Sequence, residues 1–216
     1  METKPILVAS RSRLCSIDEF TQDYLAKIPM PAVFTMADGS AAPHSIATEA
    51  RIDFTDRSLF ALFRGNYTAL RYAENLPVEP DTGKSHTLWM HSDVYELFVG
   101  PNSRATGMYK EFQVAPDSRF IDIHVNRAEG KSNPQWRSGM RCRSFVDDAK
   151  KNWTAVMEIP WNCFDADYRS DCEWNTNLYR ATGKFHGDEL LAWSPTGYGE
   201  RAFHRYEHFG RIVFER

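Results

Sequence analysis

The stretch "TEARIDFTDRSLFALF", residues 48–63, predicts a β-hairpin. Ala50, Ile52 and Phe54 alternate with polar side chains, which is the period of a strand with one buried face. The segment "TDRS" supplies turn residues, and the apolar run at 59–63 is typical of a central strand. Because two strands joined by a short turn run in opposite directions, the hairpin indicates an antiparallel sheet.

Further strand-like runs follow along the chain, separated by Gly, Pro, Asn and Asp. These predicted strands are residues 94–100, 110–116, 119–126, 141–147, 153–161, 173–183, 189–195 and 211–216. Many strands with hardly any helix between them favour antiparallel sheets over βαβ units. We therefore predict an all-β fold, an antiparallel β-sandwich of the jelly-roll type.

One short helix is predicted near the N-terminus, at residues 18–28. Phe20, Tyr24 and Ile28 recur there at helical spacing, and Asp18 is the expected N-cap.

The chain length of 216 residues fits a single domain. We predict one β-sandwich domain over residues 1–216, with residues 1–45 as an N-terminal extension that packs on it. The polar stretches 73–87 and 126–139 are predicted as long loops, and binding groups usually sit on such loops.

The charge of the chain argues against two classes of partner. Charged residues make up 25% of the sequence and the formal net charge is -3, so there is no positive excess for gripping phosphates, and we expect no nucleic acid partner. No apolar run approaches the roughly 20 residues that cross a bilayer, so we expect no membrane partner. The start shows no basic segment followed by a long apolar stretch, so the protein either stays in the cytoplasm or is exported with its leader removed.

The four cysteines form no CxxC pair and have no histidine at finger-like spacing, so the sequence does not predict a zinc site. We expect free thiols at Cys15, Cys142, Cys163 and Cys172. A bridge between Cys163 and Cys172 in an oxidising compartment stays open.

Glu96 is the first candidate for a functional residue. Strand alternation places it between Val94 and Phe98 on one face, where a carboxylate is costly unless a partner or ligand hydroxyls meet it. Two explanations stay open at this point: an internal ion pair with Arg180, or contact with a ligand. Trp89 stands just before this strand, either as a lid on the core or as a wall on which the apolar face of a sugar ring could stack.

The order of several segments resembles the family 9 carbohydrate-binding modules and their single-domain relatives. These segments are "SDVYELFVGP", "MYKEFQVAPDSRFID", "WTAVMEIPW", "WNTNLYRAT", "LLAWSPT" and "FHRYEHFGRIVF". The resemblance runs from about Thr48 to the end of the chain. It implies a β-sandwich that binds the reducing ends of glucose- or xylose-based chains and clamps a sugar between two tryptophans.

The resemblance implies a set of site residues. Glu96 falls on the sugar-binding glutamate of the family, and Trp89 falls within one position of the first aromatic wall. Phe203 takes the place of the second tryptophan. The predicted carbohydrate-binding residues are Trp89, Glu96, Gln113, Asn177, Tyr179, Arg180 and Phe203. The expected function is non-catalytic binding of a mono- or oligosaccharide of glucose or xylose type, with no catalytic residue.

The polar side of the implied site departs from the family pattern. Gln113 and Ala115 stand where the family has an arginine and an asparagine, and Tyr179 stands where it has a glutamine. Asn177 matches a family asparagine.

No cofactor is predicted with certainty, and calcium is the one that the resemblance allows. Asp93, Asp117 and Asp122 offer oxygen ligands, although their spacing is not that of an EF-hand. His204 and His208 would face together only on a helix, which the glycines of the loop at 197–210 disfavour. No metal ligand is therefore assigned, and the loop is interpreted as an aromatic wall.

Three alternative functions stay open. A glycan-active enzyme would need a carboxylate pair, for which Glu96 with Glu111 or Glu158 are the pairings to test. The groove could also have become a protein interface. A haem-binding sandwich would need axial ligands, and the candidates are Met90, His91, Met108 and His124.

Overall fold

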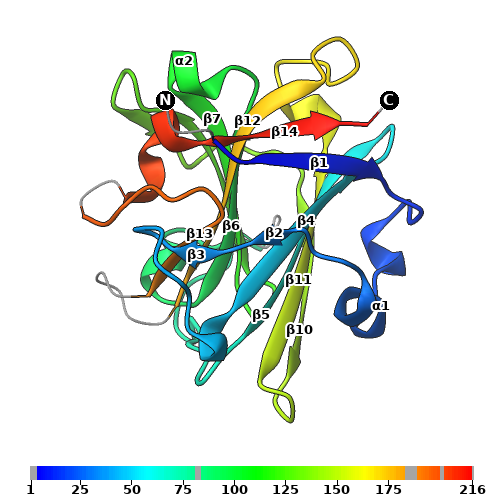
Figure 1. Cartoon of the computed structure of the whole chain (residues 1–216), viewed down its shortest axis with the longest axis vertical. Coiled ribbons are helices and arrows are strands. Elements are labelled where there is room, and N and C mark those ends of the chain that lie inside the picture. The colour runs from blue at the N-terminus through cyan, green and yellow to red at the C-terminus, as the bar shows by residue number, and fades with distance from the viewer. Residues whose placement is uncertain (1–3, 81–83, 183–188, 200–201, 216) are drawn as a thin grey trace.

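The structure is a computed structural model that describes residues 4–80, 84–182, 189–199 and 202–215. Two β-sheets pack face to face, as predicted (Figure 1). The sheet that we call the back sheet consists of β10 (Arg141–Asp147), β11 (Asn152–Pro160), β5 (Ser58–Asn66), β4 (Thr48–Phe54) and β2 (Ala32–Val33). The front sheet consists of β14 (Gly210–Phe214), β12 (Glu173–Ala181), β6 (Val94–Gly100), β7 (Met108–Val114), β8 (Phe120–Asn126) and β9 (Lys131–Asn133), with β13 (Leu190–Ala192) and β3 (Thr35–Met36) beside β12.

Strand β1 (Ile6–Arg11) joins the two sheets. Its first part pairs with β14 and its last two residues pair with β4, and both pairings are parallel. Figure 1 shows β1 alongside β14 across one end of the sandwich. The prediction of purely antiparallel sheets therefore needs a correction here, because only strands joined by a short turn are forced to run in opposite directions. The other strand pairings are antiparallel.

The predicted hairpin at 48–63 is confirmed as β4 and β5. Ala50, Ile52 and Phe54 face the core between the sheets, as their alternation indicates. Phe60 and Leu62 of β5 point to the other face, where the N-terminal segment covers them. The continuous apolar run of β5 is thus explained by burial on both faces.

The N-terminal helix is shorter than predicted. A 3-10 helix at Ile17–Glu19 is capped by Ser16, and α1 (Gln22–Lys27) begins after Thr21, whose hydroxyl accepts a hydrogen bond from the Tyr24 N–H. The prediction of Asp18 as the cap was wrong, because a hydroxyl at each helix start takes that role. Both helices pack on the outer face of the back sheet, while β1, β2 and β3 of the predicted N-terminal extension are strands of the two sheets.

The four cysteines are free thiols. The remaining helices are all short. These helices are α2 (Ser103–Thr106) and the 3-10 helices η2 (His44–Ile46), η3 (Leu88–Met90), η4 (Trp161–Cys163), η5 (Ala202–His204) and η6 (Tyr206–His208). Within the described ranges, no helix has the length and apolar character needed to span a bilayer.

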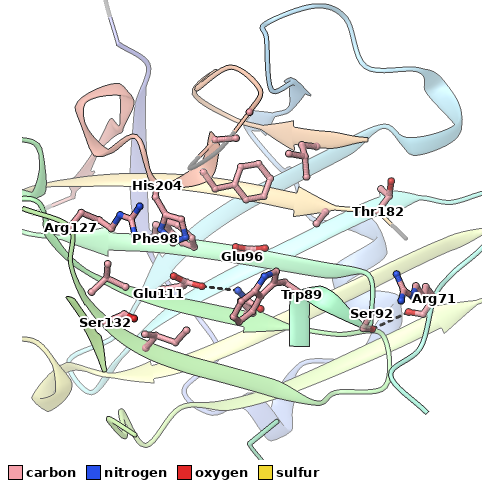
Figure 2. A pocket seen from close by; sticks show the side chains of 18 residues that line it. Arg71, Trp89, Ser92, Glu96, Phe98, Glu111, Arg127, Ser132, Thr182 and His204 are labelled. Carbon is pink, nitrogen blue, oxygen red and sulfur yellow. Dashed lines mark hydrogen bonds between the residues drawn. The ribbon is translucent and has the colours of Figure 1, made fainter. Parts of the chain in front are cut away.

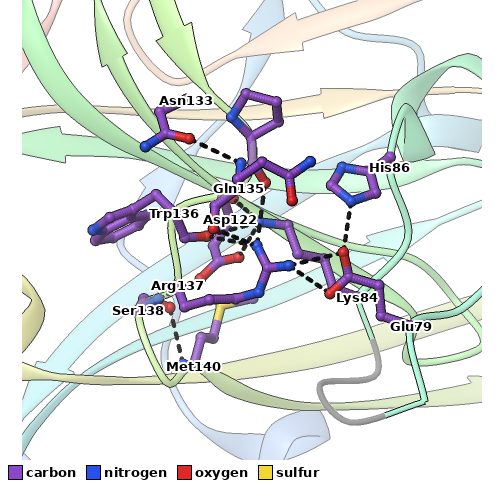
Figure 3. A network of polar contacts seen from close by, with 11 residues as sticks. Glu79, Lys84, His86, Asp122, Asn133, Gln135, Trp136, Arg137, Ser138 and Met140 are labelled. Atoms are coloured by element: carbon purple, nitrogen blue, oxygen red, sulfur yellow. Dashed lines mark hydrogen bonds and ion pairs between the residues drawn. The ribbon is translucent and has the colours of Figure 1, made fainter.

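A buried lysine ties the two predicted loops to the front sheet (Figure 3). Lys84 is 0% exposed, and its Nζ lies 2.7 Å from Oδ1 of Asp122. The same ammonium donates to the carbonyl oxygens of Asp122 at 2.5 Å and Trp136 at 2.9 Å. Burial lowers the pKa of Lys84, and the Asp122 carboxylate opposes this shift. Lys84 lies in one predicted loop, Asp122 lies on β8 and Trp136 lies in the other predicted loop, so one charged side chain holds all three segments together.

A second ion pair joins the same loops at the surface. Arg137 donates two hydrogen bonds to the Glu79 carboxylate, at 2.8 and 2.6 Å, and His86 Nε2 lies 2.7 Å from the same carboxylate. The exposed pairs add less to stability than the buried lysine, because water screens them.

We expect Lys84→Met to lower the free energy of unfolding by about 3–5 kcal/mol, because the Asp122 carboxylate would stay buried without its cation. Urea unfolding would measure this loss. Adding Asp122→Asn should recover part of it. The control is Lys150→Met, which removes an exposed lysine 2.8 Å from Asp147 and should leave stability unchanged. If Lys84→Met were as stable as Lys150→Met, the structural role of Lys84 would be contradicted.

Candidate functional site

A cavity of about 430 Å³ opens on the outer face of the front sheet. Its floor is made by side chains of β6, β7 and β8 that point away from the core between the sheets. Trp89 of η3 and Phe203 of η5 line it from outside the sheet. The predicted pair of Trp89 and Glu96 therefore meets in one cavity (Figure 2).

The floor of the cavity follows from strand alternation. Glu96 and Phe98 lie two residues apart on β6, and Glu111 and Gln113 lie two residues apart on β7. The register pairs Glu96 with Gln113 and Phe98 with Glu111. The two carboxyl groups are thus diagonal neighbours on one face of the sheet.

Both carboxyl groups are buried, with Glu96 2% and Glu111 3% exposed. Burial raises the pKa of Glu96, and the nearby Glu111 charge raises it further. Burial also raises the pKa of Glu111, against a hydrogen bond from Gln113 Nε2 at 2.7 Å and the positive charge of Arg127. The two groups compete for ionisation, so they hold protons at a higher pH than isolated glutamates.

The second aromatic wall is held by a relay of side chains behind it. The rings of Tyr179 and Phe203 stack with centroids 4.1 Å apart, and the Tyr179 hydroxyl donates to the Phe203 carbonyl oxygen at 2.8 Å. Asn177 Nδ2 in turn donates to the Tyr179 hydroxyl at 2.8 Å and to the Ser194 carbonyl oxygen at 2.7 Å. Neither Asn177 nor Tyr179 lines the cavity, and both position the wall instead.

Arg180 lies on the opposite side of the front sheet from Glu96. Its Nη1 donates to Thr48 Oγ1 at 2.8 Å, and its guanidinium lies over the Tyr95 ring in the core. Glu96 and Arg180 therefore form no ion pair. Tyr179 is the residue in register with Glu96, and the next residue of β12, Arg180, points to the core side of the sheet.

His204 was not among the predicted carbohydrate-binding residues, although it belongs to the cavity. Its ring lines the cavity, and its Nδ1 lies 2.7 Å from the Tyr109 hydroxyl. Burial lowers the pKa of His204 to about 4, and the charge of Arg127 adds to this shift. The ring is therefore neutral at pH 7. Glu111 could have been added to the binding site from sequence, because it shares a strand face with Gln113, whereas nothing in the loop sequence distinguishes His204 from His208.

The structure separates the candidates for the alternative functions. Glu158 lies on β11 of the back sheet, where its carboxylate accepts hydrogen bonds from the Ile17 N–H and the Ser58 hydroxyl. Glu111, in contrast, shares the cavity with Glu96. None of the proposed haem ligands lines this cavity; they are Met90, His91, Met108 and His124.

The candidate calcium ligands have protein partners. Asp117 pairs with Arg119 at 3.3 Å, and Asp122 carries the Lys84 ammonium. Asp93 is buried and also has a partner. Across the residues that the structure describes, no three His, Cys, Asp or Glu side chains form a group that could hold a metal ion.

Comparison with solved structures identifies the fold. A protein from Bacteroides uniformis, to which carbohydrate binding has been attributed, superimposes with a TM-score of 0.69 at 18% identity over 99% of this chain and 100% of that one. A family 9 carbohydrate-binding module from Caldicellulosiruptor kristjanssonii in complex with glucose gives a TM-score of 0.61 at 10% identity, over 98% and 96% of the two chains. The chain has the fold of a family 9 carbohydrate-binding module.

The same bacterium supplies a family 9 module in complex with cellotriose, with a TM-score of 0.60 at 11% identity over 98% of this chain and 94% of that one. No family model matches the sequence. No curated protein matches it either. The predicted resemblance is confirmed as a likeness of fold.

We expect Glu111→Gln to stabilise the protein at pH 8 but not at pH 4. In the folded protein the pKa of Glu111 is raised from 4.5 to about 7, so the folded state binds its proton more tightly than the unfolded chain does. The free energy of unfolding of the wild type therefore falls as the pH rises from about 4.5 to about 7. Glutamine keeps an oxygen for Gln113 but cannot ionise, so the gain at pH 8 should be on the order of 1–3 kcal/mol.

Urea unfolding at the two pH values would measure this gain. Glu129→Gln, which removes an exposed carboxylate after β8, is the matched control and should show no pH-dependent difference. A Glu111→Gln variant whose stability follows the wild type at both pH values would contradict the burial of an ionisable Glu111.

Proposed function

We propose that this protein is a non-catalytic carbohydrate-binding protein that holds a sugar ring of a mono- or oligosaccharide in the cavity. Trp89 and Phe203 offer aromatic faces to the apolar side of the ring. Glu96 and Gln113 accept and donate hydrogen bonds at its hydroxyl edge. The observation that carries the proposal is that an indole, a phenyl ring and a buried carboxyl group line one cavity of about 430 Å³.

The size and chemistry of the cavity support a sugar as ligand. Its volume lies in the range of small-molecule sites, about 300–1,000 Å³, and it combines apolar walls with a few polar groups on the floor. Structures of the same fold carry glucose and cellotriose, which favours a pyranose of glucose or xylose type.

Three of the predicted contact residues have other roles in this proposal. Tyr179 and Asn177 act through the position of Phe203, and Arg180 fills the core between the sheets. Direct sugar contact is therefore assigned to Trp89 and Phe203 together with the groups on the cavity floor.

We expect Trp89→Ala and Glu96→Gln each to weaken the binding of glucose and cellotriose by about tenfold or more. The first removes a stacking face, and the second removes a carboxyl group that accepts hydroxyl hydrogen bonds in its ionised form. Isothermal titration calorimetry would measure the affinities, and circular dichroism would show that the fold is intact. Phe145→Ala is the control, because it removes a half-buried aromatic ring from β10, on the back sheet. Unchanged affinity in both site variants would reject the cavity as the binding site.

One observation favours hydrolysis as a second candidate function: two carboxyl groups with raised pKa line the same cavity. If the protein is an enzyme, incubation with cellotriose or a xylo-oligosaccharide should release new reducing ends, and Glu96→Gln and Glu111→Gln should each abolish the release. Binding without product at pH 5, 6 and 7 would leave only the binding function.

A further inference from the structure

Resting on the proposed function, we infer that the cavity selects a sugar ring that carries a protonated amino group, of the 2-amino-2-deoxyhexose type, over neutral sugars. The juxtaposition that points to this ligand is Glu96 and Glu111 on adjacent strands beneath Trp89. Each carboxyl group comes from the cavity face of its strand and lines the same cavity.

The acceptors on the cavity floor outnumber the donors. Gln113 uses its Nε2 on Glu111, and its Oε1 is buried with no hydrogen-bond partner in the described ranges. Glu96 is nine-tenths buried and lines the cavity, and no hydrogen bond or ion pair reaches its carboxyl group from the described parts of the chain. An ammonium group has three N–H donors and no acceptor, so it matches these oxygens better than a hydroxyl does.

Among the residues that the structure describes, no cation forms an ion pair with either carboxyl group. Arg127 is half-buried and its charge acts on Glu111, but no ion pair joins it to either glutamate where the structure describes the chain. Figure 2 shows Arg127 and Arg71 on opposite sides of the view, with both glutamates between them. His204, behind Phe98, is neutral at pH 7 because burial lowers its pKa. A ligand ammonium would therefore meet both carboxyl groups in the cavity and favour their ionised form.

The buried glutamates also explain why a neutral sugar fits less well. Filling the cavity with a neutral ring removes water from two carboxyl groups that already share a desolvated site, which disfavours their ionised form. An ammonium replaces that water with charge-assisted hydrogen bonds, so ligand binding and ionisation favour one another.

The aromatic walls are compatible with the same ligand. Trp89 and Phe203 can stack on the apolar face of the ring, and an aromatic face attracts a nearby cation. A quaternary ammonium would use the aromatic faces alone, because it has no N–H group for the Glu96, Glu111 and Gln113 oxygens. The floor therefore favours a primary ammonium on a sugar over a choline-like ligand.

The test compares D-glucosamine with D-glucose, N-acetyl-D-glucosamine and choline by calorimetry at pH 6.5. We expect glucosamine to bind about tenfold more tightly than the two neutral sugars and choline, as one charge-assisted hydrogen bond would provide. Titration in two buffers of different ionisation enthalpy should show net proton release with glucosamine and none with glucose, because the ammonium favours the ionised carboxylates.

Two variants test whether Glu111 is responsible for the preference for glucosamine over glucose. Glu111→Gln should bring the affinities for glucosamine and glucose to within about threefold of each other and abolish the proton release, because the ammonium loses its ionisable partner on β7. Glu129→Gln removes the same charge from the surface and should keep the full preference.

The outcomes separate the two proposals. Glucose binding equal to or tighter than glucosamine overturns the inference and leaves carbohydrate binding intact, and so does a preference that survives in Glu111→Gln. Tighter binding of choline than of glucosamine also overturns it. Folded protein that binds none of the sugars overturns the proposed function itself.

Discussion

The structure depends on the burial of both faces of strand β6. One face, with Tyr95, Leu97 and Val99, packs into the core between the sheets, where the Tyr95 ring stacks on Trp153 with centroids 3.7 Å apart. The other face carries Glu96 into the cavity. A slip of one residue would place the glutamate in the core and a tyrosine in the cavity, so apolar packing fixes the register. The position of the carboxyl group is therefore set by the residues behind it.

The protein buries charge in two different ways. Lys84 and Asp122 neutralise each other and hydrogen-bond to neighbouring backbone groups, so their burial holds the loops beside the cavity. Glu96 and Glu111 repel each other, and their burial costs folding free energy. The first arrangement stabilises the fold, whereas the second resembles the strained polar groups that proteins keep at binding sites.

Much of the fold could be predicted from local sequence patterns, because alternation and turn residues mark the hairpin and the longer strands of the front sheet. The short strands β3 and β9 could not be predicted in this way, and β9 lies inside the stretch 126–139 that was predicted as a loop. Strand β1 could not be predicted either, since its parallel partners β14 and β4 lie far away in sequence and no turn connects them. The helix start was misplaced because Asp18 precedes an apolar run just as Thr21 does. Only the backbone shows which side chain accepts the hydrogen bond.

The candidate site was predictable where strand period decides it and unpredictable where loops decide it. Glu96 follows from alternation, and so does Glu111 once the register is known, whereas Gln113 was implied by the resemblance alone. Asn177 and Tyr179 were predicted as sugar contacts, yet here their polar atoms bind each other and the backbone of the loop that carries Phe203. The loop that carries Phe203 folds back over the sheet through contacts between residues far apart in sequence. The roles of Asn177 and Tyr179 therefore could be assigned only from the structure.

The parallel pairing of β1 with β14 also constrains how the chain folds as it is synthesised. Ile6–Arg11 leaves the ribosome first, but Gly210–Phe214, its partner over most of its length, emerges after every other strand described here. The nascent chain can offer β1 only the short contact with β4 until then. Closure of the sandwich is therefore a late, non-local event, which is characteristic of slow folding and leaves strand edges unpaired until the last strand is made.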